Sequence, residues 1–386
     1  MAPSTTTLAR PVELIRVQRR GSPAFKCAVA EMQGWRSNHE DAHSVHCGEK
    51  LADFWVLDGH RGNDAATFGA DALAQEIGQA MDGKNLPTNA EIHKGLETVD
   101  NMLRNHLAKD ETHRQAGSTV AGALIAQQSN GTYTAKMVNC GDSRGVVVRA
   151  PQERKSSAHA ATIRLPQHFQ KFEEEDCWTA DASWLPSWPA IVETIDHKPS
   201  HPIERSRIEA AGGRVCGGRR ARIDGNLSVS RGLGDFDFKD DVNLSASEQK
   251  VSCVPDIYEV EGLQAGALLV LACDGLWDVL TSEEAASFVR GRLRRDPEAD
   301  LGAIAAALIR VCLKLDSSDN MTVLIVHFVD GSSWSQAEDE IIGFDKLWGP
   351  GGPIDKDTKK HYMEFLDKLR VPPDLFTFHV GDQDFS

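Results

Sequence analysis

Aspartates and glutamates stand at the ends of several apolar, strand-like segments of this 386-residue sequence. The clearest case is the apolar run 54–57, which is followed directly by Asp58, Gly59 and His60. A buried strand that ends in a carboxylate places that carboxylate at the rim of a core, where a hard cation can bind. An Asp-Gly pair is also typical of an ordinary turn, so this segment alone does not distinguish a metal site from a turn.

The same arrangement recurs at four other places in the chain. Each combines an acid with the beginning or the end of a predicted strand, and the acids are Glu40, Asp41, Asp142, Asp274, Asp278 and Asp319. If the strands belong to one pair of sheets, the acids converge at one end of the core. Converging carboxylates repel one another and take up protons unless a cation compensates them. Because oxygen ligands suit Mg²⁺ or Mn²⁺ better than Zn²⁺, the pattern predicts a site with several hard metal ions.

Two further residues beside these acids suit the chemistry of phosphate esters. Metal ions held close together activate water and bind a phosphoryl oxygen, which is hydrolytic chemistry. Arg36 can bind a phosphate through two parallel hydrogen bonds. His60 can protonate a leaving oxygen near neutral pH. On the residues alone, a surface ion pair for Arg36 and a hydrogen-bonded loop imidazole for His60 remain open as alternatives.

The elements that would position these residues are short strands and amphipathic helices. Turn signals at Asn130-Gly131 and Gly141-Asp142 leave links of hairpin length, which favours antiparallel pairing. Helices are expected after Thr88 and Thr281, each of which begins a capping box. Strands are expected over residues 25–32, 54–57, 118–126, 133–139, 145–149, 227–229, 267–272 and 321–329, and two more helices over 64–81 and 301–315.

Three segments lack this periodic pattern. Residues 1–22 are predicted to form a loose N-terminal arm. Residues 150–192 are predicted to be a tryptophan-rich insertion, either a flap that contacts substrate or a regulator, or a disordered loop. Residues 331–386 form a C-terminal extension with one amphipathic helix, which is expected to pack on the domain rather than on a partner. The apolar face of that helix carries Tyr362, Phe365, Leu366 and Leu369.

Composition limits the classes of partner. The net charge of −15 argues against nucleic acid, because no large basic face is evident. No apolar run is long enough for a membrane span, so no membrane anchor is expected. The eight cysteines are scattered without a Cys-x-x-Cys pair, which is typical of reduced thiols in an intracellular protein of the cytoplasm or nucleus. We expect a monomer.

Taken together, the motifs resemble those of the protein phosphatase 2C family of metal-dependent serine/threonine protein phosphatases. They occur in the family's order between about residues 23 and 330. The segments that carry the resemblance are Met32-Gln-Gly-Trp-Arg36, Glu40-Asp41, Asp58-Gly-His60, Gly117-Ser-Thr119, Gly141-Asp142-Ser-Arg144, 227–235, Asp274-Gly-Leu-Trp-Asp278 and Asp319-Asn-Met-Thr322.

The resemblance implies an α+β fold in which two stacked antiparallel sheets are flanked by helices, with a metal cleft at one end of this four-layer αββα sandwich. It implies that Asp58 bridges two Mg²⁺ or Mn²⁺ ions and that the Gly59 carbonyl binds one of them. Asp274 and Asp319 would complete the second metal position, and Glu40 and Asp41 would act directly or through water. Asp142 and Asp278 would bind a weaker third ion.

The resemblance also implies a mechanism. Arg36 would bind the phosphate, and His60 would be the general acid. Water shared by the metals would attack phosphoserine or phosphothreonine of a phosphoprotein without a phosphoenzyme intermediate. The family's flap would fall at about residues 200–240. Two alternatives stay open: an inactive relative that binds phosphoproteins, and a phosphatase for small phosphoesters.

Overall fold

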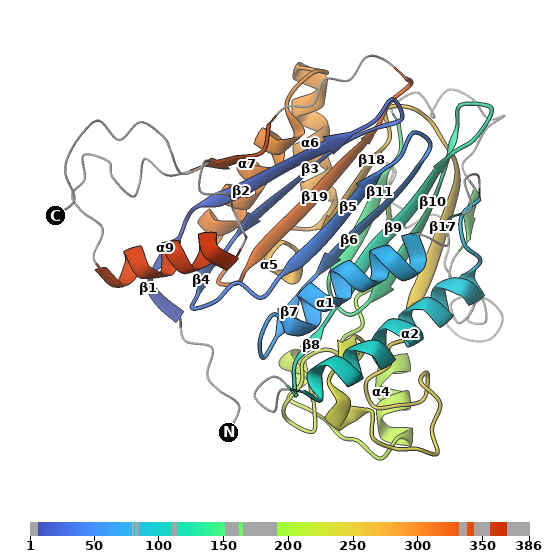
Figure 1. Cartoon of the computed structure of the whole chain (residues 1–386), viewed down its shortest axis with the longest axis vertical. Coiled ribbons are helices and arrows are strands. Elements are labelled where there is room, and N and C mark those ends of the chain that lie inside the picture. Colours follow the sequence, from blue (N-terminus) through green and yellow to red (C-terminus); the bar gives the residue numbers. More distant parts are fainter. Residues whose placement is uncertain are drawn as a thin grey trace.

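Two antiparallel sheets stack face to face at the centre of the molecule (Figure 1). The structure is a computed structural model that describes residues 7–78, 81, 85–109, 114–150, 162–164, 191–331, 338–342 and 356–368. One sheet has the order β13 (Ile191–Glu193), β11 (Arg144–Val148), β18 (Leu268–Ala272), β19 (Met321–Phe328), β3 (Phe25–Met32), β2 (Ile15–Gly21) and β20 (Glu340–Ile342). The other has the order β12 (Thr162–Arg164), β17 (Asp256–Leu263), β10 (Tyr133–Cys140), β9 (Val120–Gln127), β6 (Leu51–Leu57) and β5 (Ala42–Cys47).

Successive side chains along each strand point to opposite faces of the sheet, and those that face the other sheet form the core between them. In β3, Phe25 and Val29 face the second sheet, whereas Ala28 and Ala30 face the helices on the other side. A strand buried on both faces reads as a nearly continuous apolar run, which is why β3 and β6 were predictable from sequence. The inter-sheet core is dominated by aromatic and β-branched side chains, among them Phe25, Phe54, Tyr133, Tyr258, Val326 and Phe328.

Helices cover the outer face of each sheet (Figure 1). The six-stranded sheet is covered by α1 (Asp64–Leu73), the π-helical turn η1 (Ala74–Gly78) and α2 (Asn89–Leu107). The seven-stranded sheet is covered by α5 (Asp274–Trp277), α6 (Ser282–Arg295) and α7 (Leu301–Lys314). Both predicted capping boxes are present, at Thr88 and Thr281. The predicted sandwich of two antiparallel sheets between helices is thus confirmed.

The prediction of a loose arm over residues 1–22 is wrong for its described part. β1 (Thr7–Val12) pairs with β4 (Gly34–Arg36), and β2 pairs with β3 inside the seven-stranded sheet. The alternation of β2 was hidden because one of its buried positions is Arg19, which is 8% exposed. Its guanidinium is paired with Asp300 at 2.5 Å and with Glu340 at 2.5 Å, so a charged residue occupies a position that reads as polar in the sequence.

The predicted insertion lies mostly outside the described residues, including its tryptophans. Inside it, β12 pairs with β17 along the edge of the six-stranded sheet. At its end, Ile191 and Val192 are buried strand residues of β13, so the sandwich resumes slightly earlier than predicted.

The chain from residue 197 to 253 forms a small unit beside β7 (Gly59–His60) and β8 (Gly117–Ser118) (Figure 1). It holds α4 (Pro202–Ala210), the hairpin of β14 (Val215–Cys216) and β15 (Arg222–Ile223) with the 3₁₀ turn η4 (Gly218–Arg220), then β16 (Leu233–Gly234) and the 3₁₀ turn η5 (Phe236–Phe238). This unit covers the stretch for which a flap was predicted and has its own apolar core, made of Ile208, Ile223, Leu227, Val229, Phe238 and Val251.

The predicted amphipathic helix of the C-terminal extension is α9 (Lys356–Lys368), which lies against β1 (Figure 1). The hydroxyl of Tyr362 accepts a hydrogen bond from the backbone N–H of Glu13 at 3.0 Å. The ring of Phe365 packs edge-on against His39, with ring centroids 5.2 Å apart. The helix therefore packs on the domain, next to the segment that carries Arg36, Glu40 and Asp41.

Candidate metal and phosphate site

The strand-end acids gather at one end of the sandwich. Asp58 follows β6 and Asp41 precedes β5, and these strands pair with Ala42 opposite Leu57. In the other sheet, Asp274 follows β18 and Asp319 precedes β19, where Ala272 lies opposite Val323. The antiparallel register thus brings acids that are far apart in sequence to the same edge.

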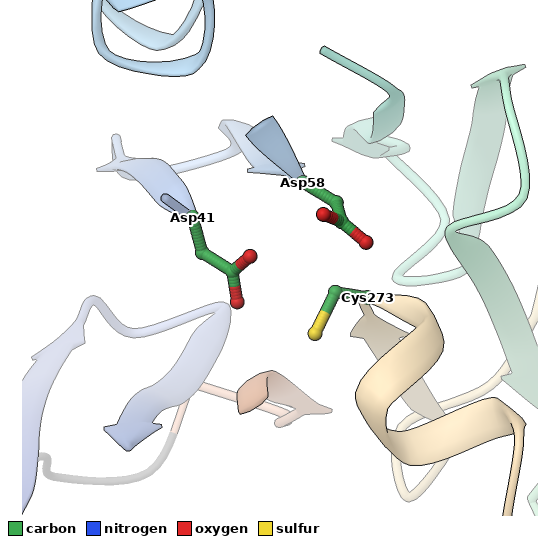
Figure 2. Close-up of side chains that lie close together, drawn as sticks. All are labelled: Asp41, Asp58 and Cys273. Atoms are coloured by element: carbon green, nitrogen blue, oxygen red, sulfur yellow. The ribbon is translucent and has the colours of Figure 1, made fainter. Parts of the chain in front are cut away.

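Two of these acids and one thiol point toward a common centre (Figure 2). One ligand atom from each of Asp41, Asp58 and Cys273 lies within 4.8 Å of the other two. Asp41 Oδ2 accepts a hydrogen bond from Thr322 Oγ1 at 2.7 Å. Its Oδ1 is buried and has no hydrogen-bond partner in the part of the chain that the structure describes. A buried oxygen without a partner is costly, and a cation would compensate it.

The electrostatics of the cluster are unbalanced. Burial raises the pKa of Asp58 well above its usual value, and the neighbouring Asp274, Asp41 and Asp319 raise it further. The pKa of Asp274 is raised well above its usual value by burial and by Asp142 and Asp319. Burial raises the pKa of Asp319 to about 6, against the opposing effect of Arg36. Without a cation, the raised pKa values keep protons on these carboxylates up to a higher pH than is usual for aspartate.

The donor set fits a hard divalent ion. The carboxylates supply oxygen ligands, which Mg²⁺ and Mn²⁺ prefer. Cys273 is a poor ligand because burial raises the pKa of its thiol well above the usual value. Its sulfur instead lies 3.2 Å from the backbone nitrogen of Thr322. The orphaned Asp41 oxygen and the raised acid pKa values are the observations that support metal binding here.

Glu40 and Gly59 are held close together at the same edge. The backbone N–H of Glu40 donates to Asn320 Oδ1 at 2.8 Å, and Glu40 Oε1 accepts from the backbone N–H of Gly62 at 2.8 Å. A Cβ on Gly59 would lie 2.3 Å from the Glu40 carbonyl oxygen, so only glycine fits at this approach. The structure therefore places both predicted ligands beside Asp58.

Arg36 reaches the acids from β4. Its guanidinium forms an ion pair with Asp319, and its backbone is held by pairing opposite Thr7 of β1. The Arg36 side chain is 29% exposed, so part of it is open to solvent beside the acids. This placement suits an arginine that binds a phosphate next to metal-binding carboxylates.

His60 is held by an acid to which the sequence analysis assigned no role. Its Nε2 lies 2.8 Å from Asp235 Oδ2 and 2.9 Å from Asp235 Oδ1. Burial by itself would lower the pKa of His60, but Asp235 outweighs burial, so the pKa is raised. A raised pKa keeps the imidazole protonated at higher pH, as a general acid requires.

Asp142 and Asp278, predicted to hold a weaker third ion, meet around a lysine. Lys198 Nζ lies 3.3 Å from Asp142 Oδ2 and 3.9 Å from Asp278 Oδ1. Asp142 is buried, whereas Asp278 is exposed. The structure thus brings the two acids together, and their role toward a third ion stays a prediction.

Several residues that support the site were not singled out from sequence. Asp235 stands in the quoted segment 227–235, and Thr322 and Asn320 stand next to Asp319, so their motifs were seen but their contacts were not. Lys198 contacts Asp142, as described above. Thr119 Oγ1 accepts a hydrogen bond from the backbone N–H of Asp58 at 3.2 Å. Asn320 and Thr322 could have been found from their closeness to Asp319 in the sequence. Asp235, Lys198 and Thr119 reach the site from elsewhere in the chain, so no local signal points to them.

The spacing between Cys216 and Arg222 is a further feature of the sequence that bears on the reaction. Cys216 and Arg222 are separated by five residues, the spacing of cysteine-dependent phosphatases. In the structure they lie opposite each other in the β14–β15 hairpin, and both are exposed. A nucleophilic cysteine needs an enclosing electropositive site that lowers its pKa. The hairpin offers no such enclosure, so this spacing is coincidental.

Comparison with known proteins places these features in a family. The protein phosphatase 2C family model matches residues 25–164 and 191–321. Human protein phosphatase 1A is 34% identical over 317 residues, covering 79% of this chain and 71% of its own. The chain belongs to the protein phosphatase 2C family. It is accordingly a serine/threonine phosphatase of a metal-dependent family.

Other relatives agree with this assignment. Mouse protein phosphatase 1B is 30% identical over 329 residues, covering 81% of this chain and 72% of its own. Among solved structures, a phosphatase from Toxoplasma gondii superposes with a TM-score of 0.64 at 23% identity, covering 85% of this chain and 98% of its own. At this identity, the likeness shows a shared fold. Among the described residues, no helix is long and apolar enough to cross a membrane.

Both β1 and α9 lie outside the residues that the protein phosphatase 2C model matches. They nevertheless contact the segment of the domain that carries the phosphate-binding candidate. β1 pairs with β4 at Arg36, and α9 packs on His39 through Phe365. In this chain, elements outside the matched residues therefore contact the segment that carries the candidate site.

Proposed function

We propose that this chain hydrolyses phosphoserine and phosphothreonine in proteins by direct attack of water on phosphorus, without a phosphoenzyme intermediate. The observation that carries the proposal is the convergence of Asp41, Asp58, Asp274 and Asp319 on one edge of the sandwich, with an orphaned oxygen and raised pKa values. Membership of the protein phosphatase 2C family supports the same chemistry.

The carboxylates would hold two Mg²⁺ or Mn²⁺ ions. Asp58 shares a centre with Asp41, and its pKa is raised by Asp274, so it is the candidate for a ligand that both ions would share. The Gly59 carbonyl, Glu40 and Asp319 stand at the same edge. When bound, the ions would activate a shared water and neutralise phosphate oxygens. Asp142 and Asp278 are the candidates for a third ion.

Protein side chains would supply the remaining steps. Arg36 would bind two phosphate oxygens and so orient the phosphorus for in-line attack. The hydrogen bond to Asp235 uses Nε2 of His60, so Nδ1 is the ring nitrogen that would give its proton to the departing serine or threonine oxygen. Asp235 would orient the imidazole and favour its protonated form.

The test is hydrolysis of phosphoserine and phosphothreonine peptides with Mn²⁺ or Mg²⁺, with and without a chelator. We expect phosphate release that the chelator abolishes and that added metal restores. Peptides should be hydrolysed with a higher kcat/KM than a small alkyl phosphate ester of similar leaving-group pKa. The reverse preference would favour a phosphatase for small phosphoesters, and absence of metal-dependent turnover on every substrate would support an inactive phosphoprotein-binding relative.

A further inference from the structure

Two cysteine side chains from different sheets meet at the end of the sandwich opposite the acids. Cys27 Sγ, on β3, lies 3.4 Å from Cys47 Sγ, the last residue of β5. Cys27 is 4% exposed and belongs to the inter-sheet core, whereas Cys47 is half-buried at its rim. The pair thus combines a cysteine buried in the core with a cysteine that is partly exposed at its rim.

The surroundings allow the small movement that an S–S bond requires. Cys47 is followed by a tight turn in which the backbone N–H of Gly48 donates to the Leu51 carbonyl at 2.8 Å. A strand-end residue beside a turn can shift more easily than one in the middle of a sheet. Cys27, in contrast, is held within β3 between β2 and β19. Closure would therefore move Cys47 toward Cys27.

We propose that Cys27 and Cys47 form a reversible disulfide that links the two sheets when the protein meets a peroxide. Cys47, the more exposed of the two residues, would attack a peroxide oxygen as thiolate, forming an S–O bond as the O–O bond breaks. The hydroxide that departs takes up the proton that the Cys47 thiol had released, and leaves as water. Cys27 sulfur would then attack the sulfenic sulfur of Cys47, forming the S–S bond as the S–O bond breaks. The departing hydroxide takes the Cys27 proton and leaves as water. The two sulfurs together lose two electrons, which reduce the peroxide.

The order of these steps follows from the environment of each thiol. The contact with Cys47 and burial both raise the pKa of Cys27 well above its usual value, so Cys27 stays protonated near neutral pH. Its Sγ also lies 3.2 Å from the Arg20 carbonyl oxygen, which can accept its hydrogen. Cys47 is the more exposed residue of the two, so its thiol is the one that a peroxide would meet first.

The link would close a loop that contains part of the candidate site. Residues 28–46 lie between the two cysteines and include Arg36, Glu40 and Asp41. Closing such a loop restricts the unfolded chain and stabilises the folded one. Cys27 lies five residues, about 17 Å along β3, from the end of that strand at the acids. The bond should therefore raise stability and leave the ligand geometry unchanged.

The experiment is treatment of the folded, Mg²⁺-loaded full chain with hydrogen peroxide, followed by thiol blocking and digestion with trypsin without reductant. Trypsin cleaves after Lys26, Arg36 and Lys50, so the two cysteines fall on separate peptides, 27–36 and 37–50. We expect these peptides joined, two hydrogen masses lighter than their sum, and separated again by dithiothreitol. The thermal unfolding midpoint should rise by about 5 °C. Phosphatase activity should stay within about twofold of the reduced protein, since the bond is remote from the acids.

Two serine variants provide the controls. Cys47→Ser, at the half-buried position, should fold normally, give no joined peptide and lose the rise in midpoint. Cys216→Ser, which removes an exposed thiol elsewhere, should retain both. The proposal is overturned if Cys216 is oxidised under conditions that never join peptides 27–36 and 37–50. It is equally overturned if the peptides join without any rise in the midpoint that Cys47→Ser abolishes.

Discussion

The molecule contains two clusters of acidic side chains that differ in the sign of the neighbouring charges. At the candidate site, Asp58 and Asp274 have neighbours of the same sign, and their pKa values are raised. Around α4, Glu204 is buried and meets cations: Arg231 Nη2 at 2.6 Å and Arg207 Nη1 at 2.6 Å. Burial alone would raise the pKa of Glu204, but these guanidinium groups hold it well below its usual value.

The difference distinguishes a carboxylate that is paired with cationic side chains of the protein from carboxylates whose charge would need a cation from outside the protein. Arg231 also binds Asp256 at 2.8 Å, so the cluster around α4 is balanced within the protein. Among the described residues, the site acids form ion pairs with two cations: Arg36 pairs with Asp319, and Lys198 pairs with Asp142 and Asp278. Natural proteins seldom leave buried charge uncompensated unless the site has a function. The comparison predicts that mutations in the two clusters will affect different properties.

The largest expected effect is on activity, from Asp58→Ala. Because it removes the predicted bridging ligand, we expect kcat to fall by about a thousandfold or more. The metal-free protein should become more stable rather than less, by about 1 kcal/mol, because like-charge repulsion at the site is relieved. Phosphopeptide kinetics and denaturant unfolding of the chelated protein measure the two properties.

Asp240→Ala is the matched control for Asp58→Ala, since it removes an exposed acid outside the site. It should change neither kcat nor the free energy of unfolding of the chelated protein appreciably. If Asp58→Ala destabilised the chelated protein by several kcal/mol, the acids would be structural, and the contrast with Glu204 would disappear.

Glu204→Gln should show the opposite behaviour. It leaves Arg207 and part of the Arg231 charge buried without a counter-ion, so we expect a loss of about 3 kcal/mol in the free energy of unfolding. Activity per folded molecule should be retained below the unfolding transition. Glu209→Gln on the same helix is the control: its pair with Arg205 is exposed at both ends, so less than about 0.5 kcal/mol should be lost. Equal losses in the two variants would contradict the comparison.

Asp235→Asn is expected to have a smaller effect, confined to proton transfer. Asp235 raises the pKa of His60, so its neutralisation should lower that pKa and deprotonate His60 at lower pH. If His60 is the general acid, the alkaline limb of the pH–rate profile should move to lower pH. Turnover should fall by about tenfold to a hundredfold for esters with poor leaving groups, and less for activated esters. A uniform loss with an unmoved profile would indicate a role in packing alone.

Much of the fold was predictable because buried strands and capped helices leave strong local patterns. β3, β6 and β19 are apolar runs, and α2 and α6 begin with capping boxes. β2 was missed because Arg19 occupies a buried position and is satisfied by Asp300 and Glu340, which are some 280 to 320 residues away. Local periodicity does not report a partner that only tertiary folding supplies.

The acids of the site were predictable for the same reason, since each stands where a recognisable strand begins or ends. Their supporting contacts were not. Asp235 reaches His60 across 175 residues, and Phe365 reaches His39 from a helix beyond the residues that the family model matches. A strand end specifies where a backbone stops, whereas the inward side chain depends on turn geometry, such as the left-handed backbone of Asp235 at φ 51°.

The smallest expected effect is on the pH dependence of stability, and it compares the two clusters directly. Asp319 has a pKa of about 6 in the folded protein, above its unfolded value, so the folded state binds the extra proton between the two values. Stability of the chelated protein should therefore fall as pH rises from 5 to 7, by about 1 kcal/mol for each acid involved. Glu204 has a lowered pKa, so its contribution to the free energy of unfolding is complete above the pKa of the unfolded chain and is lost only in stronger acid.

From pH 5 to 7, the chelated wild type should lose stability, and Asp58→Ala should lose less. Saturating Mn²⁺ should reverse the slope, because metal binding requires the deprotonated acids. A flat profile for the chelated wild type would show that the site carboxylates are already balanced, as those around Glu204 are.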